Sequence, residues 1–119
     1  LHSVSGTLAE TDGVQKIPLK RFLTDVKKGT FFILRPQIDS IKTQTVLRKA
    51  LTKLRQDIAF DHEFNNADST AFYCSEFIQF IFDKGARISC FETRNVSKKN
   101  IYMFNSIFSN PEFKVVYKW

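Results

Sequence analysis

One of the two cysteines, Cys74, lies where a helix is predicted to begin directly after a polar loop. At a helix start, free backbone NH groups and the positive end of the helix dipole favour a thiolate. Cysteine hydrolases present their nucleophile in this way, at a helix start with a route to solvent. Cysteine is also among the most buried residue types, so composition and spacing alone favour a packing role over a catalytic one.

A thiolate hydrolase also needs a base, usually a histidine, and a polar group that orients this base. The chain has two histidines. His2 precedes a predicted strand but is the second residue, where chain ends usually fray. His62 lies between Asp61 and Glu63 in the polar loop and reads as a surface residue. Each histidine alone is more often structural or incidental than catalytic.

The residues around Cys74 suggest support rather than acid–base chemistry. Glu76 lies on a helix expected to be buried, where a carboxylate needs a partner; we expect first-turn NH groups or an arginine. The Tyr73 hydroxyl either points into a site or bonds locally, and Asp61 is placed to brace the loop. Cys90 follows the end of the helix and reads as a packing residue or a bystander thiol.

The two cysteines and two histidines lack the spacing of a zinc site, so we expect neither a metal nor a cofactor. No apolar run approaches the roughly 20 residues that a membrane-spanning helix needs, so we expect no integral membrane segment.

Hydrophobic periodicity predicts an α+β domain with helices packed on a small sheet. The strongest helix, over residues 40–59, places Leu47, Leu51, Leu54 and Ile58 in one inward stripe. The helix that contains Cys74 is apolar nearly all round and should be central, with Gly85 as its C-terminal cap. We further expect strands over 1–9, 31–34 and 113–119, and helices over 18–25 and 98–108, the latter capped by Ser97.

The net charge of +6 comes from the first half, because residues 61–119 hold equal numbers of basic and acidic residues. Lys42, Lys49 and Lys53 fall on the predicted outer face of the helix over 40–59. No aromatic residue interleaves with these lysines, as a nucleic-acid stacking platform requires. We therefore expect no nucleic-acid partner.

Two motifs resemble a known family. The sequence is similar to the signature of YiiX/YaeF/YebB-like permuted papain-fold cysteine amidases, which are relatives of the NlpC-type peptidases. The similar residues are Phe60-Asp61-x-x-Phe64, a short polar stretch, and then Tyr73-Cys74-Ser75-Glu76. Four shorter stretches upstream also resemble this family: Gly13-Val14, Pro18-Leu19, Phe22-Leu23 and Ile33-Leu34-Arg35. The resemblance as a whole covers roughly residues 1–84.

The resemblance implies that Cys74 is the nucleophile, with Tyr73, Ser75, Glu76 and Asp61 supporting the site. It implies a permuted order, with a histidine strand before the nucleophile helix, but the family's usual histidine motif is absent. In the placement that we favour, His2 lies on the family's second strand as the third polar residue of the catalytic triad, and the base histidine precedes Leu1. In the other placement, His2 is the base and Glu10 orients it.

We accordingly expect one permuted papain-like domain over residues 1–119 that lacks its N-terminal strand or strands. The implied function is a cysteine amidase or peptidase that forms a thioester with cell-wall peptides or other amides. A lipid or ester acyl hydrolase or acyltransferase of the same superfamily, and a non-catalytic ligand-binding member, are the alternatives. Relatives are often exported or associated with the cell envelope, which suggests the same location here.

Overall fold

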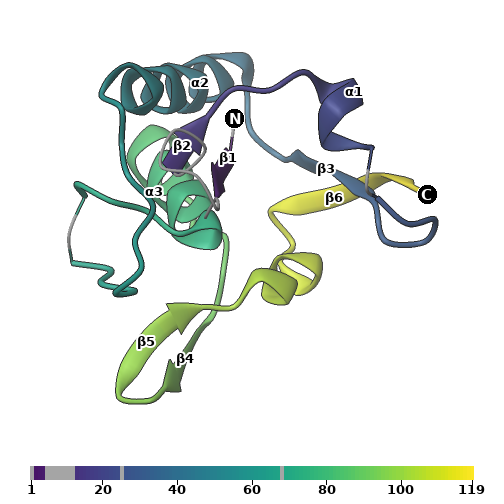
Figure 1. Ribbon diagram of the computed structural model, residues 1–119. Helices are drawn as coiled ribbons and strands as arrows, with labels where there is room; N and C mark the ends of the chain where they lie inside the picture. Colours follow the sequence, from purple (N-terminus) through teal and green to yellow (C-terminus); the bar gives the residue numbers. More distant parts are fainter. Residues whose placement is uncertain (1, 5–12, 25, 68) are drawn as a thin grey trace.

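Three antiparallel strand pairs surround two packed helices in the computed structural model, which describes residues 2–4, 13–24, 26–67 and 69–119 (Figure 1). Of residues 2–4 only the backbone is described. The strand pairs are β1–β2, β3–β6 and β4–β5. The elements in chain order are β1 (His2–Val4), β2 (Gly13–Gln15), α1 (Leu19–Phe22), β3 (Phe32–Pro36), α2 (Ser40–Arg55), α3 (Cys74–Ala86), β4 (Thr93–Val96), β5 (Lys99–Tyr102), the 3-10 helix η2 (Phe104–Ser109) and β6 (Phe113–Lys118).

The helix that begins at Cys74 is central, as predicted. Helix α3 packs against α2 and also contacts β1 and β5. Phe72, two residues before α3, and Phe77, within it, are each 1% exposed and belong to one core cluster with Cys90 and Ile107. The α+β fold predicted from periodicity is confirmed. In the described part of the chain, no helix is long and apolar enough to cross a membrane.

The inward face of α2 differs from the predicted stripe. Val46 and Ala50 are buried, whereas Leu47 and Leu51 are 57% and 41% exposed. The reason lies across the interface, where Gly85 of α3 meets α2 backbone to backbone. A Cβ on Gly85 would lie 2.7 Å from the Cα of Val46. Two helices can approach this closely only where small or slender side chains face each other.

Gly85 is therefore a packing residue and not the predicted C-terminal cap. Helix α3 continues to Ala86, and Arg87 adopts the left-handed conformation (φ 55°) that ends it. The NH groups of Arg87 and Ile88 then bond the carbonyls of Asp83 and Phe82, which satisfies acceptors at the helix end.

The helix predicted over residues 98–108 is also wrong. Residues 93–102 form the β4–β5 hairpin, and only Phe104–Ser109 is helical, as the 3-10 helix η2. Ser97 and Lys98 form the two-residue turn, with φ values of 50° and 68°. Two-residue hairpin turns of this kind need positive φ at both positions and usually carry glycine or asparagine. Ser97 is therefore a turn residue and not a helix cap.

The loop before α3 connects the helix to the first strand pair. The Val14 NH of β2 donates to the Ile58 carbonyl (2.9 Å), and Ala59 forms an isolated parallel bridge with Ala71. The Phe72 NH then donates to the Ala59 carbonyl (3.1 Å). Gly13 makes this possible, because a side chain there would collide with the Ile58 carbonyl. The backbone just before Cys74 is thus fixed relative to β2.

The close contact at Gly85 should reverse the usual effect of a glycine-to-alanine substitution on the stability of a helix. In an ordinary helix interior, replacing glycine by alanine stabilises the protein by about 1 kcal/mol. We expect Gly85→Ala to lower the free energy of unfolding by about 1–3 kcal/mol instead, because α2 must move away from α3. Urea unfolding followed by circular dichroism measures this change. An increase in the free energy of unfolding would contradict the close packing of α2 on α3.

Candidate active site

Cys74 is the first residue of α3, and its side chain is exposed. Its two neighbours are buried, Tyr73 at 2% and Ser75 at 3% exposure. Tyr73 is the N-cap residue with an extended backbone, and its NH donates to Oε2 of Glu76 (3.1 Å). The carboxylate of Glu76 thus bonds back to the start of its own helix, as in one half of a capping box. A carboxylate in the first turn also interacts favourably with the helix dipole.

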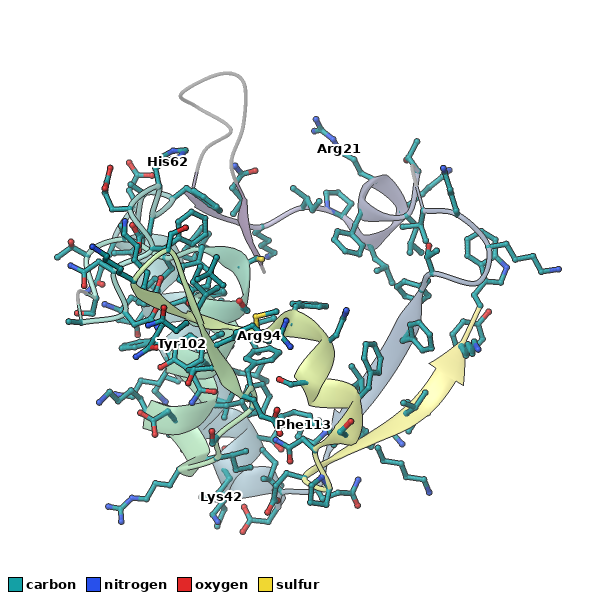
Figure 2. The ribbon with its side chains drawn as sticks, turned by 90° about the horizontal axis from the view of Figure 1, so that it is seen from below. Arg21, Lys42, His62, Arg94, Tyr102 and Phe113 are labelled. Carbon is teal, nitrogen blue, oxygen red and sulfur yellow. The ribbon has the colours of Figure 1, made fainter. Side chains whose placement is uncertain are left out.

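The two buried neighbours of Cys74 both bond the backbone of Tyr102, the last residue of β5. The Tyr102 NH donates to the Tyr73 hydroxyl (3.0 Å), and the Ser75 hydroxyl donates to the Tyr102 carbonyl (2.8 Å). We call this pair of hydrogen bonds the Tyr102 clamp. Figure 2 places Tyr102 among the side chains beside α3. The clamp fixes the residues on either side of Cys74 and leaves the thiol between them exposed.

The polar loop before α3 is joined to the same network. The Tyr73 hydroxyl donates to Oδ1 of Asn66 (2.7 Å), and Nδ2 of Asn66 donates to the Asn100 carbonyl (2.6 Å). Asp61 is buried and accepts from the NH groups of Glu63 (2.8 Å) and Asn65 (2.6 Å) with its two oxygens. The loop is therefore held by side-chain to backbone bonds, and Asp61 lies at its start.

Burial raises the pKa of the Tyr73 phenol to about 12, and the negative charge of Glu76 adds to this effect. The hydrogen bonds from the Tyr102 NH and with Asn66 act in the opposite direction. The phenol therefore keeps its proton at neutral pH. It can donate to Asn66 while it accepts from Tyr102, as the clamp requires.

The second cysteine has a different environment. Cys90 is 0% exposed, and burial followed by the nearby Asp83 carboxylate raises the pKa of its thiol to about 12. The Cys90 NH donates to Oε1 of Gln79 (2.8 Å), which ties the segment after α3 to the helix. Cys90 packs in the core, in agreement with one of the two sequence interpretations.

The strand that carries His2 lies beside the helix that carries Cys74. Strand β1 pairs with β2, with His2 opposite Gln15, and β1 contacts α3 (Figure 1). The structure therefore brings the strand of His2 to the helix that begins at Cys74. Glu10, the other candidate on the first strands, lies outside the described residues. His62 packs its ring against Phe60, with 5.0 Å between ring centroids.

Sequence reasoning missed Tyr102 and Asn66, because it placed residue 102 in a helix and Asn66 in a featureless loop. The available signal for a strand was Ile101 next to Tyr102, because both residue types are enriched in strands. Within the described ranges, no group of three or more His, Cys, Asp or Glu side chains is arranged to hold a metal ion.

Comparison with known proteins agrees with this geometry. Residues 7–117 match the family of permuted papain-like amidase enzymes, YaeF/YiiX, C92 family. The chain belongs to this family. The fold predicted from the FDxxF and YCSE motifs and the membership in a family of cysteine hydrolases are thereby confirmed.

A solved structure shares the fold. The crystal structure of a protein described as the metalloprotein YiiX from Escherichia coli O157:H7 superposes with a TM-score of 0.78 at 16% identity. The match covers 91% of this chain and 72% of that protein. A search of curated proteins found no match.

The two thiols should react very differently in the folded protein. At neutral pH we expect iodoacetamide to modify Cys74 and leave Cys90 intact. Cys74 is exposed, whereas a pKa of about 12 leaves roughly one Cys90 in 10⁵ ionised at pH 7. Mass spectrometry of tryptic peptides measures both rates, and Cys74→Ser serves as a control that should take up no label. Equal labelling of both thiols without denaturant would contradict this environment for Cys90.

The Tyr102 clamp should contribute measurably to stability. Tyr73→Phe removes the hydroxyl that accepts from Tyr102 and donates to Asn66, so two partly buried groups lose a partner. We expect the free energy of unfolding to fall by about 1–3 kcal/mol. Tyr117→Phe is the matched control, because Tyr117 is 48% exposed, and it should change stability by less than about 0.5 kcal/mol. Equal effects of the two substitutions on urea unfolding would argue against the clamp.

Proposed function

We propose that this protein hydrolyses amide bonds through a thioester on Cys74, acting on cell-wall peptides or other small amides. The observation that carries the proposal is the exposed thiol at the first residue of α3, between two buried neighbours fixed by the Tyr102 clamp. Family membership supports hydrolase chemistry. The clamp supports Cys74 as the residue that performs it.

In the first half of the reaction, the Cys74 thiolate attacks the amide carbonyl carbon and a C–S bond forms. The NH groups of Cys74 and Ser75 are in the first turn of α3, where NH groups have no partner within the helix. In our proposal these NH groups donate to the developing oxyanion. When the tetrahedral intermediate collapses, the C–N bond breaks and the amine leaves with a proton from a histidine imidazolium.

In the second half, the same histidine takes a proton from water, which attacks the thioester carbonyl. A C–O bond forms, the C–S bond breaks, and the carboxylic acid leaves as the Cys74 thiolate returns. His2 belongs to this site in our proposal, because its strand lies against α3. It serves either as the third polar member, which orients the imidazole, or as the base itself. In the latter role Glu10 would orient it.

Four residues keep Cys74 in position and take no part in bond making or breaking: Tyr73, Ser75, Glu76 and Asp61. Tyr73 and Ser75 form the clamp, Glu76 fixes the start of the helix, and Asp61 fixes the loop that precedes it. Their expected contribution is positional, since a shift of about 1 Å in a reacting group can cost on the order of 100-fold in rate.

The test is a panel of small acyl amides and peptides, with the corresponding esters, assayed by amine or alcohol release and by intact-protein mass. We expect turnover of amides and a transient mass increase equal to the acyl group on Cys74. Cys74→Ala should lower kcat by at least about 10³-fold. The matched control, Cys90→Ala, should keep activity because Cys90 is buried in the core.

Turnover that survives in Cys74→Ala would overturn the assignment of the nucleophile. Turnover of the esters alone would favour a lipid or ester acyl hydrolase. Saturable binding of panel members with neither turnover nor an acyl adduct would identify a non-catalytic member of the family.

A further inference from the structure

The basic charge of the protein is concentrated in two segments, and most of their residues lie on one side of it. Residues 13–36 and 113–119 hold eight of the 18 lysines and arginines but only one of the 12 acidic residues, Asp25. Their net charge of +7 exceeds the +6 of the whole chain, so the remaining residues together carry −1. Besides β2, these segments contain α1, β3 and β6, and these last three elements lie on the same side of the molecule in both views (Figures 1 and 2).

Strands β3 and β6 form a two-stranded ribbon, and one face of it holds the ribbon on the body. Phe113, labelled in Figure 2 where the ribbon joins the body, is buried and contacts Phe82 of α3 edge-on, with 5.2 Å between ring centroids. Phe32 contacts Phe108 of η2 in the same way, at 4.9 Å. Phe113 on this inner face belongs to the core cluster, and Leu34 packs against that cluster.

The opposite face of the ribbon is exposed and combines apolar with basic side chains. Exposure alternates along β3, so Ile33 and Arg35 point outward. The register pairs Ile33 with Tyr117 and Arg35 with Lys114, and the Trp119 NH continues the ladder by donating to the Phe31 carbonyl. Ile33, Tyr117 and Trp119 are 44%, 48% and 42% exposed. We call this surface, made of Ile33, Arg35, Lys114, Tyr117 and Trp119, the outer ribbon face.

Helix α1 adds side chains of the same two kinds. Leu19 and Phe22 are 64% and 47% exposed. Lys20 and Arg21 lie between them in the sequence, and Arg21 extends from α1 into solvent (Figure 2). The outer ribbon face and α1 thus present aromatic, aliphatic and basic side chains together, and every charged residue among them is positive.

This combination fits the surface of an anionic lipid bilayer. Lysine and arginine are attracted to anionic headgroups, by about 1 kcal/mol for each residue near the surface. Tryptophan and tyrosine favour the interface between headgroups and acyl chains, and exposed leucine and isoleucine gain by leaving water. We propose that the outer ribbon face and α1 dock the protein on anionic membrane surfaces.

Two other occupants fit less well. A second copy of the chain would bring one strongly positive face against another, which opposes association. A single-stranded nucleic acid would use basic and aromatic side chains, but exposed aliphatic residues such as Leu19 and Ile33 offer no surface on which bases stack. The proposal concerns a surface other than Cys74 and does not depend on the proposed hydrolase activity.

Trp119 is the only tryptophan in the chain, so its fluorescence reports on this surface alone. We expect its emission to shift to shorter wavelength with vesicles of phosphatidylcholine and phosphatidylglycerol, and to be quenched when the lipids carry brominated acyl chains. Pure phosphatidylcholine vesicles should give no shift. Binding should weaken steeply as salt is added.

The charge requirement is tested with paired variants. Arg35→Glu with Lys114→Glu should weaken binding to the anionic vesicles by about 100-fold or more, since reversing these two charges lowers the net charge at the interface by four units. Arg48→Glu with Lys49→Glu makes the same change in net charge on exposed positions of α2 and should weaken binding less than about threefold. Circular dichroism and thermal unfolding confirm that each variant is folded.

Three results would overturn the proposal. The first is the absence of a fluorescence shift with anionic vesicles. If an oligonucleotide then quenches Trp119, the surface binds nucleic acid instead. The second is a shift that appears on concentrating the protein without lipid, which would identify a second copy as the occupant. The third is equal weakening of vesicle binding by the two charge-reversal pairs. Binding would then depend on the net charge of the whole protein and not on the outer ribbon face.

Discussion

The geometry around Cys74 depends on the backbone of one residue, Tyr102. Its NH and carbonyl bond the two residues that flank the thiol, and both of these residues are buried. A buried hydroxyl that is hydrogen-bonded to the backbone has few alternative orientations. If the bond breaks, both groups are left without a partner and away from water, which costs free energy. The rest of the local structure follows from this constraint. The loop over 61–67 is tied to the Tyr73 hydroxyl through Asn66, and β5 is held against the start of α3.

A second constraint sets the position of α3 in the core. Gly85 allows the backbones of α2 and α3 to meet, so Val46 and Ala50 of α2 face inward and the larger Leu47 and Leu51 flank them. Together the two constraints fix α3 near each of its ends. The helix start, where Cys74 lies, is fixed by hydrogen bonds, whereas the helix end is fixed by packing.

The sequence predicted the parts of the site that depend on local pattern. The apolar run after Tyr73 and the polar loop before it located the helix start and Cys74, and the motif around them identified the family. It misplaced the inward face of α2, because periodicity gives a stripe of leucines but cannot show that a glycine on another helix requires Val46 and Ala50 there. It also missed the β4–β5 hairpin, since Ser97 and Lys98 adopt positive φ without the glycine or asparagine that usually signals such a turn. The role of Tyr102 could not be predicted for the same reason, because the partner of Tyr73 lies on the strand that this turn creates.

The Tyr102 clamp also determines when the site can form. Its two hydrogen bonds join residues 27 and 29 positions apart in the chain, so they close only after the β4–β5 hairpin has formed and docked on α3. Contacts between distant residues pay the entropy of loop closure before they contribute stability. During synthesis, a chain that has not yet reached residue 102 can form the helix of Cys74 but cannot fix the residues on either side of the thiol. We therefore expect Cys74 to reach its final geometry late in folding, after the helix that carries it.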